Sequence, residues 1–276
     1  MTSNASVAPH ESYDPAYFAP LFAIEDRHFW FRARNQVIAM LVRQLTAGLA
    51  PGYRVLEVGC GTGNVLQALE QACPSGTVVG MDLFAEGLRY ARRRTHCPLV
   101  QGDAHAAPCA TPFALIGLFD VLEHLSDDGQ ILHDLRGLLA PEGALLLTVP
   151  AYPRLWSYCD EASYHCRRYT PHALAGKLRR SGYRIEYLSP YMASLFPLVW
   201  PGWRLAAVLH WGTARMPGHG AVLASAELQV WPGINELLAW VLAQETRLLA
   251  RRCRLPLGTS LVVIARRASP HEWDKT

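Results

Sequence analysis

Short apolar runs and amphipathic runs alternate through the middle of the chain. Six short and mainly apolar runs predict buried strands, at 54–58, 77–82, 98–103, 113–119, 143–150 and 183–189. Four runs between them have a helical pattern, at 64–72, 85–94, 126–139 and 171–180. Alternation at this spacing predicts an α/β fold, in which helices cover a doubly wound and mostly parallel sheet.

The two ends of the chain break this alternation. Residues 1–14 predict a flexible tail, and residues 15–50 predict an N-terminal helical cap with apolar residues at 3–4 spacing. An apolar run at 260–267 predicts one last strand. The predicted core therefore comprises residues 51–189 and 258–268.

Residues 190–257, between the last two predicted strands, predict a helical insertion or lid. The segment is rich in Trp, Pro and Leu, and it contains Trp200, Trp203, Trp211, Trp231 and Trp240. Aromatic residues at this density can wall a pocket for a hydrophobic substrate, bury a dimer face, or contact a membrane surface peripherally. A buried accessory core is the fourth interpretation.

Composition narrows the class of protein. Half of the 276 residues are hydrophobic and 18% are charged, which allows a sizeable core. The net charge of +3 does not indicate nucleic acid, and the basic run at 91–94 is expected to be a solvated helix end. Seven cysteines without a CxxC pair, no signal-peptide pattern and no unbroken apolar run of spanning length predict a cytoplasmic protein without a transmembrane segment. The sequence leaves the choice between a monomer and a homodimer open.

A glycine-rich turn follows the first predicted strand in the sequence VLEVGCGTGN. Ligands of open parallel sheets bind at the carboxyl ends of the strands, so Gly59, Gly61 and Gly63 are placed to contact one. A P-loop is excluded because no Lys is near, and the dinucleotide pattern needs a Gly where Asn64 stands. Glu57 would repel a pyrophosphate but suits the ammonium group of an amino acid.

Acidic residues end the next two predicted strands. Asp82 can accept hydrogen bonds from ribose hydroxyls, and Asp103 can accept one from an adenine amine. The ordered set VLEVGCGTG, VVGMD, QGDA, FDVLEHL and LLAPEGALLLTVP resembles the class I S-adenosylmethionine-dependent methyltransferases. The resemblance implies a seven-stranded Rossmann-like sheet and S-adenosyl-L-methionine as the cofactor. It also implies these cofactor-binding residues: Glu57, Gly59, Gly61, Gly63, Asp82, Leu83, Asp103, Ala104 and Asp120.

The strand-4 segment DVLEHL offers the first candidates for catalysis. Asp120, Glu123 and His124 are spaced so that they could share one face of a helical turn, as a proton acceptor or as ligands of a divalent cation. The spacing resembles ubiquinone-pathway O-methyltransferases, in which this cluster is associated with a metal, although Asp120 replaces a more usual Glu. Bracing of the helix is the alternative.

Substrate contacts are expected from two further segments. SYHCRRYT at 163–170 resembles a methyltransferase subgroup with the motif HxRRYT, encountered in glycan and natural-product assembly. The candidate substrate-binding residues are His28, Trp30, Tyr152, His165, Arg168 and Tyr169, and packing is the alternative for each. Zinc at Cys159, His165 and Cys166 fits no usual ligand spacing.

These features predict methyl transfer from S-adenosylmethionine to a small-molecule acceptor. O-methylation in a biosynthetic pathway is the first expectation, and a hydrophobic acceptor would suit the Trp-rich insertion. Transfer to N, C or S, methylation of a protein or RNA, and a non-catalytic scaffold remain the alternatives.

Overall fold

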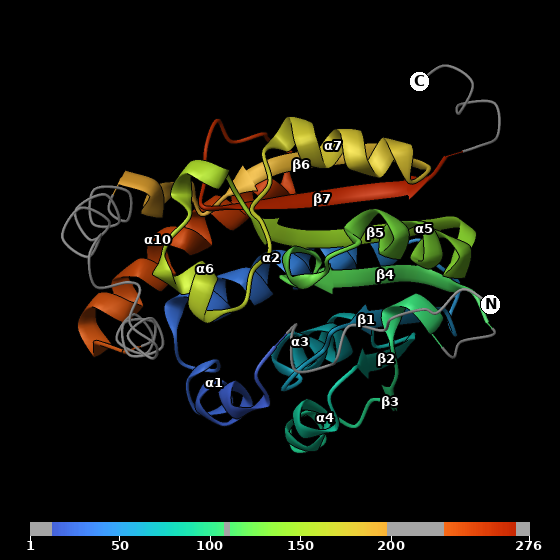
Figure 1. Cartoon of the computed structure of the whole chain (residues 1–276), viewed down its shortest axis with the longest axis horizontal. Coiled ribbons are helices and arrows are strands. Elements are labelled where there is room, and N and C mark those ends of the chain that lie inside the picture. The colour runs from blue at the N-terminus through green and yellow to red at the C-terminus, as the bar shows by residue number, and fades with distance from the viewer. Residues whose placement is uncertain (1–12, 108–110, 198–228, 269–276) are drawn as a thin grey trace.

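The computed structural model describes residues 13–107, 111–197 and 229–268, which form a three-layer α/β arrangement (Figure 1). The strands are β1 (Arg54–Val58), β2 (Thr77–Asp82), β3 (Leu99–Gln101), β4 (Phe113–Phe119), β5 (Leu139–Pro150), β6 (Tyr183–Tyr191) and β7 (Ser260–Arg267). The α-helices are α1 (Phe18–Ile24), α2 (Phe29–Thr46), α3 (Asn64–Ala72), α4 (Ala85–Ala91), α5 (Asp128–Leu138), α6 (Tyr158–Ala162), α7 (Pro171–Arg180) and α10 (Pro232–Ala250).

The seven strands form a single sheet in the order β3-β2-β1-β4-β5-β7-β6. β7 runs antiparallel to β5 and β6, and the pairs among the first five strands are parallel. This confirms the predicted mostly parallel, doubly wound sheet. The strand order reverses between β1 and β4, and such a switch point is where open α/β sheets bind their ligands.

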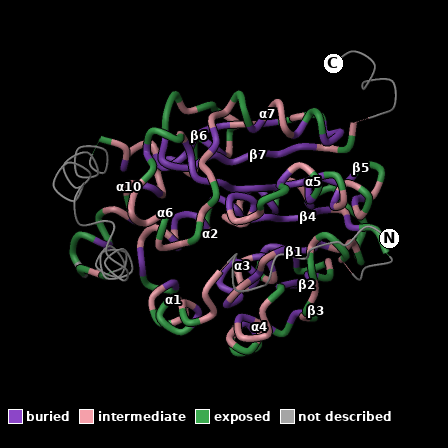
Figure 2. The backbone as a smooth tube through the Cα atoms, in the orientation of Figure 1, coloured by how far each residue is buried: buried purple, intermediate pink, exposed green. Residues whose placement is uncertain are grey.

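Both faces of the sheet are covered, so two hydrophobic layers form. Successive strand residues point to opposite faces. In β5, Leu146 belongs to the layer beneath α2 and α3, whereas Leu145 and Leu147 belong to the layer beneath α5 and α7. In Figure 2 the strands are mainly purple, the colour of buried residues. Because both faces of the sheet are buried, the strands have continuous apolar sequences.

The N-terminal cap is less regular than the sequence predicts. A 3-10 turn (Pro15–Tyr17) and α1 precede α2, and α2 begins where the His28 Nδ1 accepts a hydrogen bond from the Trp30 N–H. An imidazole at this position caps the helix in the way that Asn or Ser usually does.

α10 lies in the chain between β6 and β7, inside the predicted insertion, and packs along α2. Trp200, Trp203 and Trp211 lie outside the described residues. Within the described ranges, no helix is both long and apolar enough to cross a membrane. The division into tail, cap, core and insertion stays a prediction.

Candidate active site

The glycine turn and the acid of β2 meet at the switch point. The backbone N–H of Gly61 donates a hydrogen bond of 2.7 Å to Oδ2 of Asp82, and Oδ1 of Asp82 accepts from the Phe84 N–H at 2.8 Å. The sequence places these groups 21 residues apart, and parallel pairing of β1 with β2 brings them together.

Each glycine of the turn has a left-handed backbone, with φ of 73° at Gly59, 50° at Gly61 and 78° at Gly63. Gly59 and Gly61 line the cavity described below, whereas Gly63 does not. A Cβ on Gly63 would lie 2.8 Å from the Cα of Ala91, so this glycine lets α3 start close beside α4.

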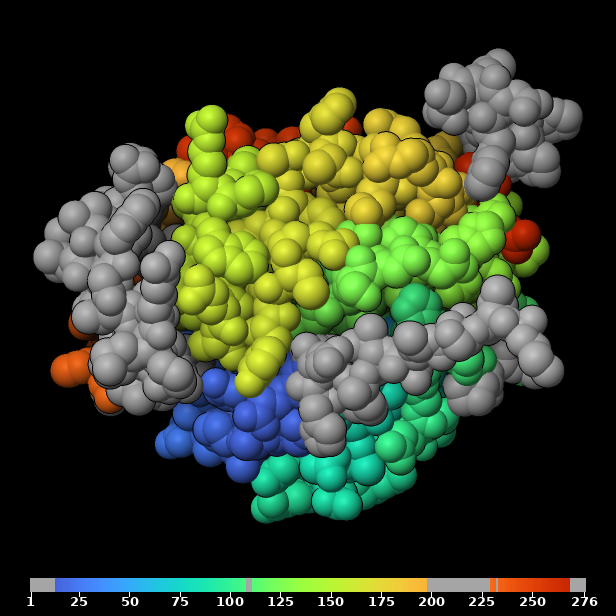
Figure 3. Space-filling view, viewed as in Figure 1, coloured from blue at the N-terminus to red at the C-terminus, as the bar shows by residue number. Residues whose placement is uncertain are grey.

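A cavity of about 910 Å³ opens from the glycine turn toward α1, α2 and the segment 158–168. On the face shown in Figure 3, that segment (yellow-green) meets the N-terminal helices (blue). The predicted site residues that line the cavity are Glu57, Gly59, Gly61, Asp82, Leu83, Asp103, Ala104, Asp120, Glu123, His124, His28, Trp30, His165 and Arg168.

The cofactor end of the cavity holds buried carboxyl groups. Burial raises the pKa of Glu57 well above its usual value, and the charge of Arg34 counteracts this in part. Burial also raises the pKa of Asp82, against the hydrogen bonds from Phe84 and Gly61. Glu57 Oε2 has no hydrogen-bond partner. A cationic ligand would satisfy these carboxylates, and S-adenosylmethionine carries both a sulfonium and an ammonium charge.

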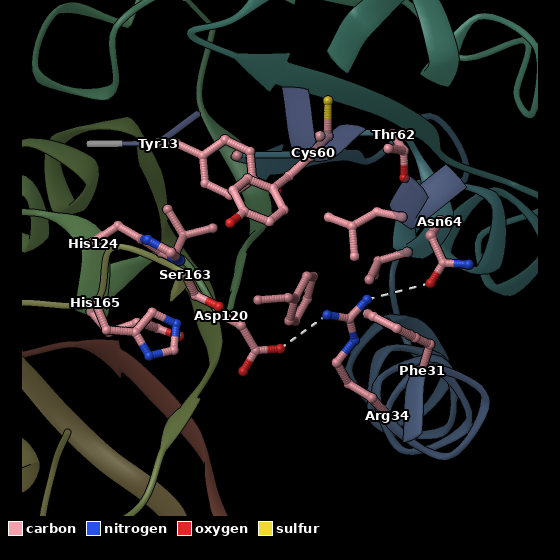
Figure 4. Close-up of a pocket in the computed structure, with 18 of the residues that line it drawn as sticks. Tyr13, Phe31, Arg34, Cys60, Thr62, Asn64, Asp120, His124, Ser163 and His165 are labelled. Carbon is pink, nitrogen blue, oxygen red and sulfur yellow. Dashed lines mark hydrogen bonds and ion pairs between the residues drawn. The ribbon is translucent and has the colours of Figure 1, made fainter. Parts of the chain in front are cut away.

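Asp120 does not share a helical turn with Glu123 and His124, as the sequence predicts that it would. β4 ends at Phe119, and Asp120 takes a φ of 56°, so the chain turns before the 3-10 helix Leu122–His124. The Asp120 carboxylate instead pairs with Arg34 of α2 at 3.0 Å, as the dashed line of Figure 4 shows. The helical-turn geometry assumed for the three residues is therefore wrong.

His165 takes the place expected of Asp120. Glu123, His124 and His165 each offer a ligand atom, and these atoms lie within 4.8 Å of one another. Both carboxylate oxygens of Glu123 and Nδ1 of His124 are buried without a hydrogen-bond partner. Such orphaned atoms fit a divalent cation, and these three residues would hold it.

The protonation of this cluster follows from its burial. Burial raises the pKa of Glu123 well above its usual value, with a further rise from the Asp120 charge. Burial and, to a smaller extent, the neighbouring His165 together lower the pKa of His124 to about 3. His124 is therefore neutral near pH 7.

Asp160 of α6 orients His165. Its Oδ1 lies 2.9 Å from His165 Nδ1 and accepts a 2.7 Å hydrogen bond from Arg168 Nε. Burial alone would raise the pKa of Asp160, but the hydrogen bonds from His165 and Arg168 outweigh it and lower the pKa. The ionised Asp160 directs Nε2 of His165 toward Glu123, whose Oε1 is 4.0 Å away.

Two residues predicted to contact the substrate lie elsewhere. The Tyr169 hydroxyl donates to Asp128 Oδ2 at 2.6 Å and is buried, and Tyr152 joins Tyr169 through its backbone. Neither lines the cavity. Arg167 also binds Asp128, at 2.8 Å, so this part of the HxRRYT segment anchors the loop to α5.

Two residues of the site region were not predicted from the sequence, one in the cavity lining and one that binds a lining residue. Tyr13, expected in the tail, lies across the cavity, with ring centroids 5.1 Å from Phe18 and 5.9 Å from His124. Arg94, expected to be solvated, has a side chain only 4% exposed and pairs with Glu25 at 2.6 Å. In the sequence, Arg94 is one of three consecutive arginines, and nothing distinguishes it from the other two.

This fold, with a cavity at its switch point, is that of the class I methyltransferases, a class whose cofactor is S-adenosylmethionine. A family model described as "Methyltransferase domain" matches residues 29–188, more than half of the chain. The chain belongs to this methyltransferase family.

Curated relatives match over shorter stretches. An uncharacterized 37.1 kDa protein in transposon TN4556 of Streptomyces fradiae is 38% identical over 48% of this chain and 39% of its own length. A trans-aconitate 2-methyltransferase of Azoarcus sp. (strain BH72) is 35% identical over 45% of this chain and 47% of its own length. The chain thus spans less than half the length of these relatives.

Solved structures share the fold at low sequence identity. A methyltransferase from the complex with the Haloferax volcanii Trm112 methyltransferase activator has a TM-score of 0.58 at 17% identity, over 93% of this chain and 96% of its own. The [4+2]-cyclase SpnF has a TM-score of 0.53 at 17% identity, over 84% of this chain and 81% of its own. Because a cyclase shares it, the fold alone does not identify the reaction.

Proposed function

We propose that the protein transfers the methyl group of S-adenosylmethionine to a hydroxyl group of a neutral and largely apolar small molecule. The observation that carries this proposal is a single cavity with two different ends. One end holds the glycine turn with Glu57 and Asp82, and the other holds the His165 imidazole backed by Asp160. In-line methyl transfer needs a nucleophile about 3 Å from the methyl carbon, and a hydroxyl also needs a proton acceptor.

The charges of the cavity support a neutral acceptor. Its carboxyl-bearing lining residues are Glu25, Glu57, Asp82, Asp103, Asp120 and Glu123, against the guanidinium groups of Arg34 and Arg168. Each of these arginines is paired with an acid of the chain, Arg34 with Asp120 and Arg168 with Asp160. Neither arginine is therefore available to bind the carboxylates of a polycarboxylate such as trans-aconitate, the compound in the names of some relatives.

His165 is the proposed proton acceptor. Because its Nδ1 donates to Asp160, Nε2 keeps its lone pair. The acceptor O–H gives its proton to Nε2 while the oxygen forms a bond to the methyl carbon. The carbon–sulfur bond breaks, its electron pair stays on sulfur, and S-adenosylhomocysteine leaves. Asp160 stabilises the imidazolium that forms.

A divalent cation at the same cluster is the second candidate for activating the acceptor. The orphaned atoms of Glu123 and His124 favour it. When bound, a cation lowers the pKa of a hydroxyl that it coordinates. Chelation distinguishes the two: turnover that survives EDTA assigns proton removal to His165, and turnover lost in EDTA and restored by Mg²⁺ or Zn²⁺ assigns it to a cation.

The test uses S-adenosylmethionine with a deuterated methyl group and a panel of phenols, aliphatic alcohols and carboxylic acids, read by mass spectrometry. We expect labelled ethers from neutral hydroxyl compounds. His165→Asn should lower kcat by about 10²–10⁴-fold with cofactor affinity retained, and the exposed His172→Asn should serve as the matched control. Cofactor binding without any labelled product would contradict the proposal, as would a preference for polycarboxylates.

A further inference from the structure

The outer face of α10 is apolar. Trp231, Ile234, Leu237 and Trp240 follow one another at intervals of three and are 64%, 60%, 59% and 63% exposed. Leu248 continues the face two turns later and is also exposed. We call these five residues the α10 outer face.

The inner face of the same helix is apolar as well. Ala239, Leu242 and Leu249 are buried, and the last two belong to the hydrophobic layer that includes α2. A surface helix of a globular protein normally has one apolar stripe and a polar opposite side. A contiguous exposed apolar patch marks a surface that binds something.

Basic residues continue the outer face toward the end of the helix. Arg247 in the last turn of α10, and Arg251 and Arg254 directly after the helix, are exposed. The two acids of α10 are engaged elsewhere: Glu236 pairs with Arg32 at 2.6 Å, and Glu245 accepts the backbone N–H groups of Ala193 and Ser194. The described part of α10 therefore presents apolar side chains followed by uncompensated positive charge.

The sequence that leads into α10 has the same character. Residues 198–228 include only three charged residues, Arg204, Arg215 and Glu227. In sequence order, a stretch with few charged residues therefore precedes α10, and arginines follow its exposed apolar residues.

We infer that the α10 outer face docks on an anionic phospholipid surface. Trp side chains favour the boundary between headgroups and acyl chains, and Leu and Ile enter the apolar side of it. Arg247, Arg251 and Arg254 lie where lipid phosphates would pair with them. A protein partner would need no such ordered change from aromatic and aliphatic residues to arginines along one helix and the residues that directly follow it.

The docking face is close to the cavity. Asn235 accepts a hydrogen bond from the Phe29 N–H and donates to the Arg27 carbonyl, which fixes the start of α10 on the start of α2. Trp30, in the same turn of α2, lines the cavity. If the proposed function holds, an apolar acceptor dissolved in the bilayer would enter the cavity from this side.

Flotation of the full chain with vesicles tests the inference. Vesicles of phosphatidylcholine mixed with phosphatidylglycerol should carry the protein upward, and vesicles of phosphatidylcholine alone should carry much less. Leu237→Ser/Trp240→Ser should reduce the bound fraction by about tenfold or more. These side chains are exposed, so the variant should fold, and circular dichroism checks this. Arg247→Glu/Arg251→Glu should weaken binding to vesicles that contain phosphatidylglycerol and should leave binding to pure phosphatidylcholine vesicles unchanged.

Trp156→Ser controls for the loss of an exposed Trp in the Leu237→Ser/Trp240→Ser variant, because Trp156 is exposed at the end of a different helix, the 3-10 helix Pro153–Leu155. Failure of wild-type protein to float, or equal flotation of the Leu237→Ser/Trp240→Ser variant, overturns the inference. A wild-type dimer that this variant loses would assign the face to a second copy and overturn it as well. Binding of S-adenosylmethionine and methyl transfer are measured in solution without vesicles. A failure of membrane docking therefore leaves these two measurements unchanged and is distinguishable from a failure of the proposed function.

Discussion

Asp82 is the residue on which the cofactor assignment is most directly tested. Replacement Asp82→Ala removes the proposed acceptor of the ribose hydroxyls and the partner of the Gly61 N–H. We expect S-adenosylmethionine binding to weaken by about 1.5–3 kcal/mol, the usual worth of hydrogen bonds to a charged group. Isothermal titration measures it, with Asp134→Ala on α5 as the control. Unchanged affinity would refute the ribose assignment.

At this scale the sequence predicted residues whose position follows from strand order. Asp82 and the glycine turn stand at strand ends, and parallel pairing brings strand ends together. The helical turn predicted to contain Asp120 was wrong, because the backbone of Asp120 is left-handed and its carboxylate pairs with Arg34, a residue 86 positions away. Tyr13 and Arg94 could not be predicted, since their roles depend on where the N-terminal segment packs.

Among the elements, the turn from β1 into α3 makes a sharp stability prediction. Gly63→Ala would force a left-handed backbone on Ala and press its Cβ against Ala91, so we expect unfolding free energy to fall by about 1–3 kcal/mol. Gly137→Ala, in α5 with open space around it, should raise it by about 0.5–1 kcal/mol. Urea titration followed by far-UV circular dichroism measures both. Equal changes in unfolding free energy for the two substitutions would show that the backbone at Gly63 is not sterically constrained.

The sequence predicted the elements of the sheet well and the peripheral elements less well. Strands buried on both faces have an unmistakable apolar pattern, and β1 matches its predicted range of 54–58. α1 and α6 are only seven and five residues long, too short for a periodic pattern to reveal them. Their positions are set by tertiary contacts, such as the capping box of Ser157 and Asp160.

At the scale of the whole molecule, Asp128 joins three segments and makes stability depend on pH. It binds Lys177 of α7, Arg167 and Tyr169. Burial alone would raise the pKa of Asp128, but these hydrogen bonds outweigh it and lower the pKa. A carboxyl whose pKa is lower in the folded state stabilises the fold above its unfolded value of about 3.9. That stabilisation is lost as the pH falls from about 4 through the folded pKa.

Asp128→Asn should therefore lower the unfolding free energy by about 2–4 kcal/mol at pH 7, since it leaves Lys177 and Arg167 without their acid. The difference from wild type should shrink below about pH 4, where the wild-type carboxyl also becomes neutral. Chemical denaturation at several pH values measures it, and the exposed Glu142→Gln is the control. A difference that stays constant with pH would contradict the charge-based account.

The ring of Tyr13 and the Arg94–Glu25 pair have a kinetic consequence. Arg94 stands at the end of α4 and Glu25 at the end of α1, while Thr62 of the glycine turn donates to the same Glu25 carboxylate. Glu25 thus ties the N-terminal segment to the glycine turn and to the residues after α4, at one border of the cavity. We expect S-adenosylhomocysteine to leave only after these contacts break, so that product release would limit the turnover rate as much as methyl transfer does.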